Sequence, residues 1–212
     1  MSGGILQVLT APRQFFAEEA ESPSALYPAA IVASLAVLGL IQQAVAFSQV
    51  SGAFTGEFAE ILLVVQAVVA VFTGALPFIV WLLYAVAFFV VSLFFDGEGS
   101  FRDVALLSAW GFLPRIAESV VGIAATVVAY QGQEVPPIED PEAFTEFTAE
   151  LASHPANVAA SVVGLALLLW SAYVWVAAVQ ESRHLDRREA TITVAVPVAV
   201  AVLFRLAGLG VV

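Results

Sequence analysis

An arginine and a glutamate stand close together inside an otherwise apolar stretch of this sequence. Arg115 comes twelve residues after Asp103, which is about 18 Å along a helix, and Glu118 follows three positions later on the same helical face. A lone arginine within a bilayer costs about 2.5–3.5 kcal/mol or more, so Arg115 needs a partner. Glu118 can supply one, and Pro114 frees the carbonyl one turn earlier as a second acceptor. Arg115, Glu118 and Pro114 therefore predict an intramembrane polar site.

Two interpretations of this site stay open on the sequence alone. In the first, the site binds a headgroup or an ion, or acts as a switching contact inside a helix bundle. In the second, Arg115 and Glu118 satisfy each other and only join helices, or Arg115 snorkels to the interface. Arg205, near the end of the last apolar segment, is expected to snorkel as a membrane anchor.

Other catalytic chemistry has little support in the residue types. The chain has no lysine for a phosphate-binding P-loop, and its two histidines, His154 and His184, stand in separate loops rather than four residues apart on one helix. It has no cysteine for a thiolate metal site or a nucleophile. The apolar segments contain no aspartate beyond Asp103 at a helix start. The sequence therefore predicts a protein that is not an enzyme and uses no metal or cofactor.

The composition is that of a membrane protein. Of 212 residues, 61% are hydrophobic and 12% are charged, and mean hydropathy is +0.95, whereas soluble domains are about 25% charged. The apolar segments are long enough for helical crossings of about 20 residues each. We expect an all-α polytopic bundle over residues 26–212, preceded by a cytoplasmic N-terminal segment, residues 1–25. The five predicted spans are 27–48, 61–95, 103–130, 157–179 and 191–209, and Gly111 and Pro114 are expected to break the third.

The second span and the sidedness of the loops are predicted together. Residues 61–95 form an uncharged run of 35 residues, about 52 Å if helical, which we interpret as one helix kinked at Pro77. Two crossings separate the loops 96–102 and 181–189, so these loops share a side, and the positive-inside rule makes that side cytoplasmic. This places the N-terminus in the cytoplasm and the C-terminus outside the cell membrane. The two loops hold Arg102, Arg183, Arg187 and Arg188.

Two amphipathic helices are expected at the membrane surface. Residues 14–20 place Phe15 and Phe16 as apolar anchors beside acidic side chains. The acidic outer loop, residues 131–155, contains a second pattern, in which Asp140 caps a helix with Pro141 in its first position. Its apolar side is formed by Phe144, Phe147 and Leu151.

The charge pattern bears on source and partners. The net charge is −11 and every basic residue is arginine, so the surface repels nucleic acid and suits high salt. We therefore expect a halophilic, haloarchaeal source; the alternative is GC-rich codon bias, which favours arginine and alanine without any adaptation to salt. The juxtamembrane cluster 181–189 has three positive and three negative side chains. It either fixes topology or docks lipid headgroups or a cytoplasmic protein.

Several short motifs along the chain stand out together: 9–16, 99–102, 110–114, Trp170, His184 and 187–190. They resemble the motifs of one known family, the Yip (Ypt/Rab-interacting protein) domain family of five-span integral membrane proteins. The resemblance covers nearly the whole chain. It implies a non-enzymatic membrane protein, which in eukaryotes is linked to Rab GTPases and vesicle traffic; for a prokaryotic member only the architecture and an organising role carry over. This chain lacks the eukaryotic aspartate-leucine-tyrosine motif and has Gly111 and Phe112 where the family has glycine and tyrosine.

Two functions follow as hypotheses. The first is a membrane adaptor or scaffold that binds a protein or lipid partner at its cytoplasmic face. The second is a small transporter or channel, working as a homo-oligomer, that uses Arg115 and Glu118 as its intramembrane site. For the first, the expected contacts are Gly111, Phe112, Arg102, Arg183, His184, Arg187 and Arg188.

Overall fold

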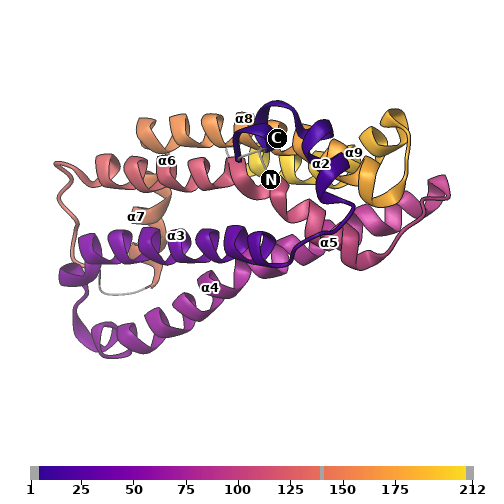
Figure 1. Ribbon diagram of the computed structural model, residues 1–212. Helices are drawn as coiled ribbons and strands as arrows, with labels where there is room; N and C mark the ends of the chain where they lie inside the picture. The colour runs from indigo at the N-terminus through magenta and orange to yellow at the C-terminus, as the bar shows by residue number, and fades with distance from the viewer. Residues whose placement is uncertain (1–4, 139–140, 209–212) are drawn as a thin grey trace.

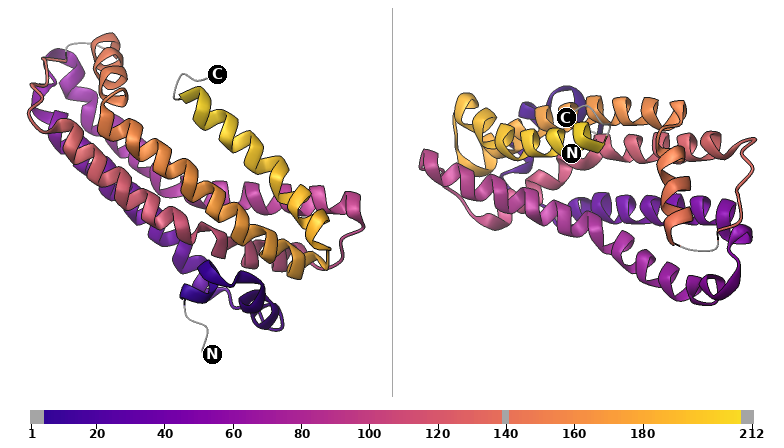
Figure 2. Two further views of the ribbon diagram at one scale, coloured as in Figure 1. Left: turned by 90° about the horizontal axis from the view of Figure 1, so that it is seen from above. Right: turned by 180° about the vertical axis from the view of Figure 1, so that it is seen from behind.

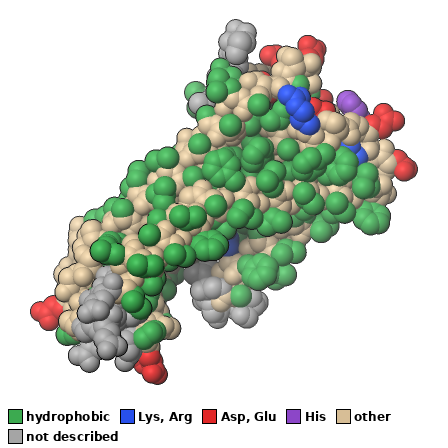
Figure 3. Space-filling model, turned by 90° about the horizontal axis from the view of Figure 1, so that it is seen from below, with side chains coloured by type: hydrophobic (Ala, Val, Ile, Leu, Met, Phe, Trp, Pro, Cys, Tyr) green, Lys and Arg blue, Asp and Glu red, His purple; other side chains and the backbone are tan. Residues whose placement is uncertain are grey.

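The computed structural model describes residues 5–138 and 141–208, and within these ranges the chain is a bundle of helices without a β-strand (Figure 1). Five helical segments are long and apolar enough to cross a membrane, which confirms the predicted all-α, five-span architecture: Leu26–Ala53, Leu63–Phe95, Phe101–Tyr130, Pro155–Arg183 and Arg187–Ala207. Hydrophobic side chains cover the flank of the bundle, while most charged groups gather toward its two ends (Figure 3). The helices are α1 (Ile5–Thr10), α2 (Pro12–Glu19), α3 (Leu26–Val50), α4 (Gly56–Ser92), α5 (Phe101–Ala109), α6 (Leu113–Tyr130), α7 (Pro141–Ala152), α8 (Pro155–Arg183) and α9 (Arg187–Gly208).

The second span is one helix, as its uncharged run predicts. α4 has 37 residues and continues through Pro77, and it runs obliquely across α3 (Figure 1). α9 contacts α8 and α4 and diverges from α8 toward its C-terminal end (Figure 2). We call the end of the bundle that carries Arg183 the Arg183 end, and the opposite end the α7 end.

The third span is broken where Gly111 and Pro114 predict a break. α5 ends at Ala109, a single 3-10 turn covers Trp110–Phe112, and α6 begins at Leu113. Proline in the second position of α6 needs no helical N–H partner, so the helix can restart there. The break turns Gly111 and Phe112 toward the centre of the bundle, where both are buried.

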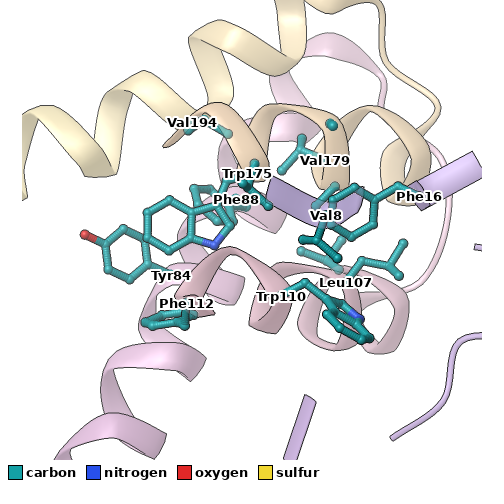
Figure 4. Close-up of a cluster of buried hydrophobic side chains, with 14 of the residues drawn as sticks. Val8, Phe16, Tyr84, Phe88, Leu107, Trp110, Phe112, Trp175, Val179 and Val194 are labelled. Carbon is teal, nitrogen blue, oxygen red and sulfur yellow. The ribbon is translucent and has the colours of Figure 1, made fainter. Parts of the chain in front are cut away.

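The core at this break is aromatic. Trp175 of α8 is fully buried; its indole stacks on Tyr84, with ring centroids 4.5 Å apart, and packs edge-on against Phe112 at 5.2 Å. Its Nε1 donates a hydrogen bond to the Ser108 carbonyl at 2.7 Å. These rings pack together across three helices (Figure 4). A side chain at Gly111 would overlap the indole of Trp175, so only glycine fits at this position.

The N-terminal helices pack on protein rather than lying in the membrane surface. Phe15 and Phe16 of α2 are buried, and Phe15 packs edge-on against Trp110 with ring centroids 4.8 Å apart. Trp170 Nε1 of α8 donates to the Leu9 carbonyl at 3.1 Å. The expectation that Phe15 and Phe16 anchor the chain in lipid is therefore wrong, because their apolar face finds a protein partner.

The acidic loop contains the helix that its pattern predicts. α7 covers Pro141–Ala152, and Asp140, its predicted cap, lies outside the described residues. Phe147 is buried and lies 6.2 Å from the Tyr130 ring, measured between centroids. The loop before α7 is fixed to the α3–α4 connection, because Ile138 N–H donates to the Ala53 carbonyl at 2.8 Å. α7 is thus held against the end of the bundle.

Candidate functional site

Arg115 and Glu118 lie in a three-residue ion-pair cluster that also includes Arg205. Arg205 Nη2 is 2.6 Å from Glu118 Oε1, and Arg115 Nε is 3.5 Å from Glu118 Oε2. The three side chains are 22–25% exposed. The expectation that Arg205 snorkels is wrong, because α9 places it within reach of the carboxylate on α6. We call Arg115, Glu118 and Arg205 the triad.

The triad forms because α8 has no side chain where the two helices approach. A Cβ at Gly164 would lie 2.7 Å from Arg205 Nη1 and 3.0 Å from Glu118 Oε1. Gly164 stands four residues after Ala160, a spacing of small residues that allows close approach of helices. That spacing is the one sequence signal for this contact, and it is too frequent in an alanine-rich chain to single out the site.

Pro114 acts differently from its predicted role. The Trp110 carbonyl, which the proline was expected to free for Arg115, accepts the Leu113 backbone N–H instead. Arg115 turns toward Glu118 and lies over the Phe112 ring, with Cζ 5.8 Å from the centroid. Pro114 therefore starts α6 and sets the direction of Arg115, and it makes no contact with the guanidinium through that carbonyl.

The triad borders a cavity of about 690 Å³. Five helices surround the cavity, and Leu151 and Ala152 of α7 close it at the α7 end. Leu35, Leu76 and Val80 form an apolar wall. Uncharged polar groups line the remainder: Gln42, Ser119, Thr126, Asn157 and Ser161. The cavity combines a net charge of +1 with a polar and an apolar side, a lining that can accept an amphiphilic anion.

A second buried arginine organises the Arg183 end. Arg183 is 2% exposed; its Nε donates to Ser92 Oγ at 2.8 Å, and its terminal nitrogens donate to the carbonyls of Gly97 and Gly99. Its Cζ lies 4.5 Å from the Phe89 ring centroid. In the described part of the chain it has no carboxylate partner. Its charge is instead compensated by carbonyl oxygens just after α4, where the helix dipole favours a cation.

Arg183 joins two connections that are far apart in sequence. Glu98 N–H donates to the Arg183 carbonyl at 3.0 Å, so the α4–α5 connection is bonded to both the backbone and the side chain of α8. Asp96, Gly99 and His184 adopt positive φ angles there, which turns the chain sharply around the guanidinium. The sequence offered no signal for this arrangement, because a juxtamembrane arginine is normally exposed.

The residues predicted as partner contacts divide into two groups. Gly111, Phe112 and Arg183 are buried and contribute to packing and loop fixation in this structure, and their role as partner contacts stays a prediction. The other four are exposed at the Arg183 end: Arg102, His184, Arg187 and Arg188. We call these four residues the end surface.

Comparisons with known proteins add the family. No solved structure matches the chain. An uncharacterized protein of the archaeon Methanocaldococcus jannaschii is 26% identical over 132 residues, which are 62% of this chain and 92% of that protein; this relative agrees with a prokaryotic source. The model of the Yip1 domain family matches residues 6–209. Since that match takes in all five long helices, the chain is a multi-pass membrane protein that belongs to the Yip1 domain family.

Proposed function

We propose that the protein is a non-enzymatic membrane adaptor that holds a protein or lipid partner at its Arg183 end. The observation that carries this proposal is the buried Arg183, which ties the α4–α5 and α8–α9 connections together. Arg102 in the first turn of α5 and Arg187 and Arg188 in the first turn of α9 directly follow these connections, so they are presented in a fixed relation. A preformed charged surface binds with less loss of conformational entropy than mobile loops do. The Yip1 domain family is not a family of enzymes, which also supports the proposal.

The cavity favours binding over conduction. Its lining includes Phe112 but no residue of α5 or of the two connections at the Arg183 end. Between the cavity and that end lie the packed rings of Tyr84, Phe112 and Trp175. A cavity closed in this way suits an adaptor with a bound ligand better than a channel, so transport is the less favoured hypothesis.

Charge reversal tests the end surface. We expect Arg187→Glu to reduce recovery of a stoichiometric partner by about tenfold, because an opposite charge replaces an attractive contact with a repulsive one. The measurement is quantitative mass spectrometry of proteins and lipids that co-purify with the tagged protein from its native membrane.

Arg13→Glu is the matched control for this variant. Arg13 and Arg187 are both exposed and both stand in the first turn of a helix, where glutamate is favourable to the helix dipole. The two variants therefore change charge equally without harming their helices. Equal partner recovery from both variants would refute the proposed end surface.

The orientation of the chain is part of the proposal, with the N-terminus and the Arg183 end cytoplasmic. The chain has no cysteine, so single cysteines can report the side of each loop. We expect Ser51→Cys and Ser153→Cys to react with an impermeant thiol reagent on intact cells, and Glu98→Cys to react only after permeabilisation. All three positions are exposed, so burial does not confuse the result. Labelling of Glu98→Cys on intact cells would show that the orientation is the opposite of the proposed one.

A further inference from the structure

The triad has one positive charge too many. Glu118 is shared by two guanidinium groups, and its Oε1 is engaged by Arg205 at 2.6 Å. Arg115 reaches the same carboxylate only through Nε, at 3.5 Å. In the described part of the chain Arg115 donates no hydrogen bond, so its terminal nitrogens have no protein acceptor. An uncompensated cation between membrane-spanning helices is costly and calls for an anion.

The surroundings of Arg115 limit which anion fits. A single negative charge restores neutrality, and the planar guanidinium binds phosphate oxygens through paired hydrogen bonds. Hydroxyl and amide groups of Ser119, Thr126 and Asn157 line the same cavity and can bind a polar headgroup. The apolar wall of Leu35, Leu76 and Val80 suits alkyl chains rather than a hydrated ion.

The size and accessibility of the cavity agree with such a ligand. Its volume of about 690 Å³ lies within the range of about 300–1,000 Å³ that is usual for small-molecule sites. The charged side chains at its edge are 22–25% exposed, so a molecule from outside the bundle can reach them. Apart from α7, the helices that surround it are candidate membrane spans, so a molecule can enter between them from the bilayer.

We propose that this cavity binds an anionic phospholipid, with its singly charged phosphodiester on Arg115 and its alkyl chains along the apolar wall. Arg205 and Glu118 neutralise each other, which leaves the single positive charge of Arg115 for the lipid. The site is separate from the end surface, so it does not depend on the adaptor role.

Native mass spectrometry of the detergent-purified protein tests the site, with phosphatidylglycerol as the anionic probe, phosphatidylcholine as the zwitterionic probe and inorganic phosphate as a competitor. We expect phosphatidylglycerol to bind more tightly than phosphatidylcholine and to remain bound when inorganic phosphate is added as a competitor. Arg115→Gln leaves the Arg205–Glu118 ion pair in place and should weaken phosphatidylglycerol binding about tenfold to a hundredfold, the value of a charge-assisted hydrogen bond. Arg13→Gln, at an exposed arginine outside both the cavity and the end surface, removes the same charge and should leave binding unchanged.

Glu118→Gln tests the site in the opposite direction, because a misfolded protein would not keep or increase its affinity for the lipid. It raises the charge of the triad to +2, so phosphatidylglycerol should bind at least as tightly as to the unchanged protein. If Arg115→Gln does not fold, the binding of phosphatidylglycerol to Glu118→Gln tests the proposal. Equal binding of the two lipids, an equal effect of Arg13→Gln and Arg115→Gln, or weaker binding by Glu118→Gln would overturn the proposal. Displacement of phosphatidylglycerol by inorganic phosphate at equal concentration would assign the site to a free anion and overturn the proposal of a lipid ligand.

Discussion

Gly111→Ala is expected to destabilise the protein by about 2–4 kcal/mol, the cost of forcing a methyl group into a filled core and losing one buried hydrogen bond. The added Cβ would overlap the Trp175 indole. That ring cannot move aside, because it stacks on Tyr84 and donates to the Ser108 carbonyl. The measurement is the free energy of unfolding, from denaturant titration in detergent.

Gly122→Ala is the control for this substitution, because it also adds one methyl group to a glycine of the third span. A Cβ at Gly122 would lie 3.3 Å from Gln42 Nε2, the mobile end of a side chain that can shift, and alanine favours the helix. The double change Gly111→Ala with Trp175→Phe should recover part of the loss, since the smaller ring leaves room for the methyl group. Equal stability of the two alanine variants would show that Trp175 does not fix the position of Gly111.

Arg183→Met is expected to cost about 3–5 kcal/mol, in the range for removing one partner of a buried charged network. Methionine fills most of the same volume but leaves Ser92 Oγ and the carbonyls of Gly97 and Gly99 without their donor. Ser92 is buried, and a buried acceptor without its donor is destabilising because water cannot replace the lost bond. The measurement is the midpoint of thermal unfolding in detergent.

Two further variants make this result specific. Arg188→Met removes an exposed arginine five residues away. It should change the free energy of unfolding by less than about 0.5 kcal/mol, so the thermal midpoint should stay close to that of the unchanged protein. Arg183→Lys should fall between the two, because an ammonium group keeps the charge but cannot bond three divergent acceptors as the guanidinium does. A thermal midpoint for Arg183→Met equal to that of Arg188→Met would contradict the bonding described for Arg183.

The five spans and the break in the third were predictable because their causes are local. An apolar run of sufficient length forms a membrane helix, and a glycine followed three residues later by a proline that can start a new helix favours a break between the two. The helix of the acidic loop follows likewise from its own apolar spacing. The uncharged run around Pro77 was also sufficient to predict one long helix.

The predictions that were wrong concern side chains whose contacts join segments far apart in the sequence. The apolar face of α2 has the same pattern whether it meets lipid or protein, so Phe15 and Phe16 could not be assigned to the core. Arg205 pairs with Glu118, 87 residues earlier, and Arg183 bonds with Gly97, 86 residues earlier. Both arginines look like ordinary interfacial residues until the helices are placed side by side.

The bonds of Arg183 also have a consequence for the order of biosynthesis. The carbonyl of Gly97 emerges from the ribosome 86 residues before the arginine that binds it, a delay of about 4–17 s at usual elongation rates. During that interval the α4–α5 connection has no guanidinium to fold around, although both of its helices already exist. Insertion of the fourth span therefore completes the connection between the second and third spans. A chain that ends before residue 183 would leave this connection without its guanidinium and open to quality-control proteases.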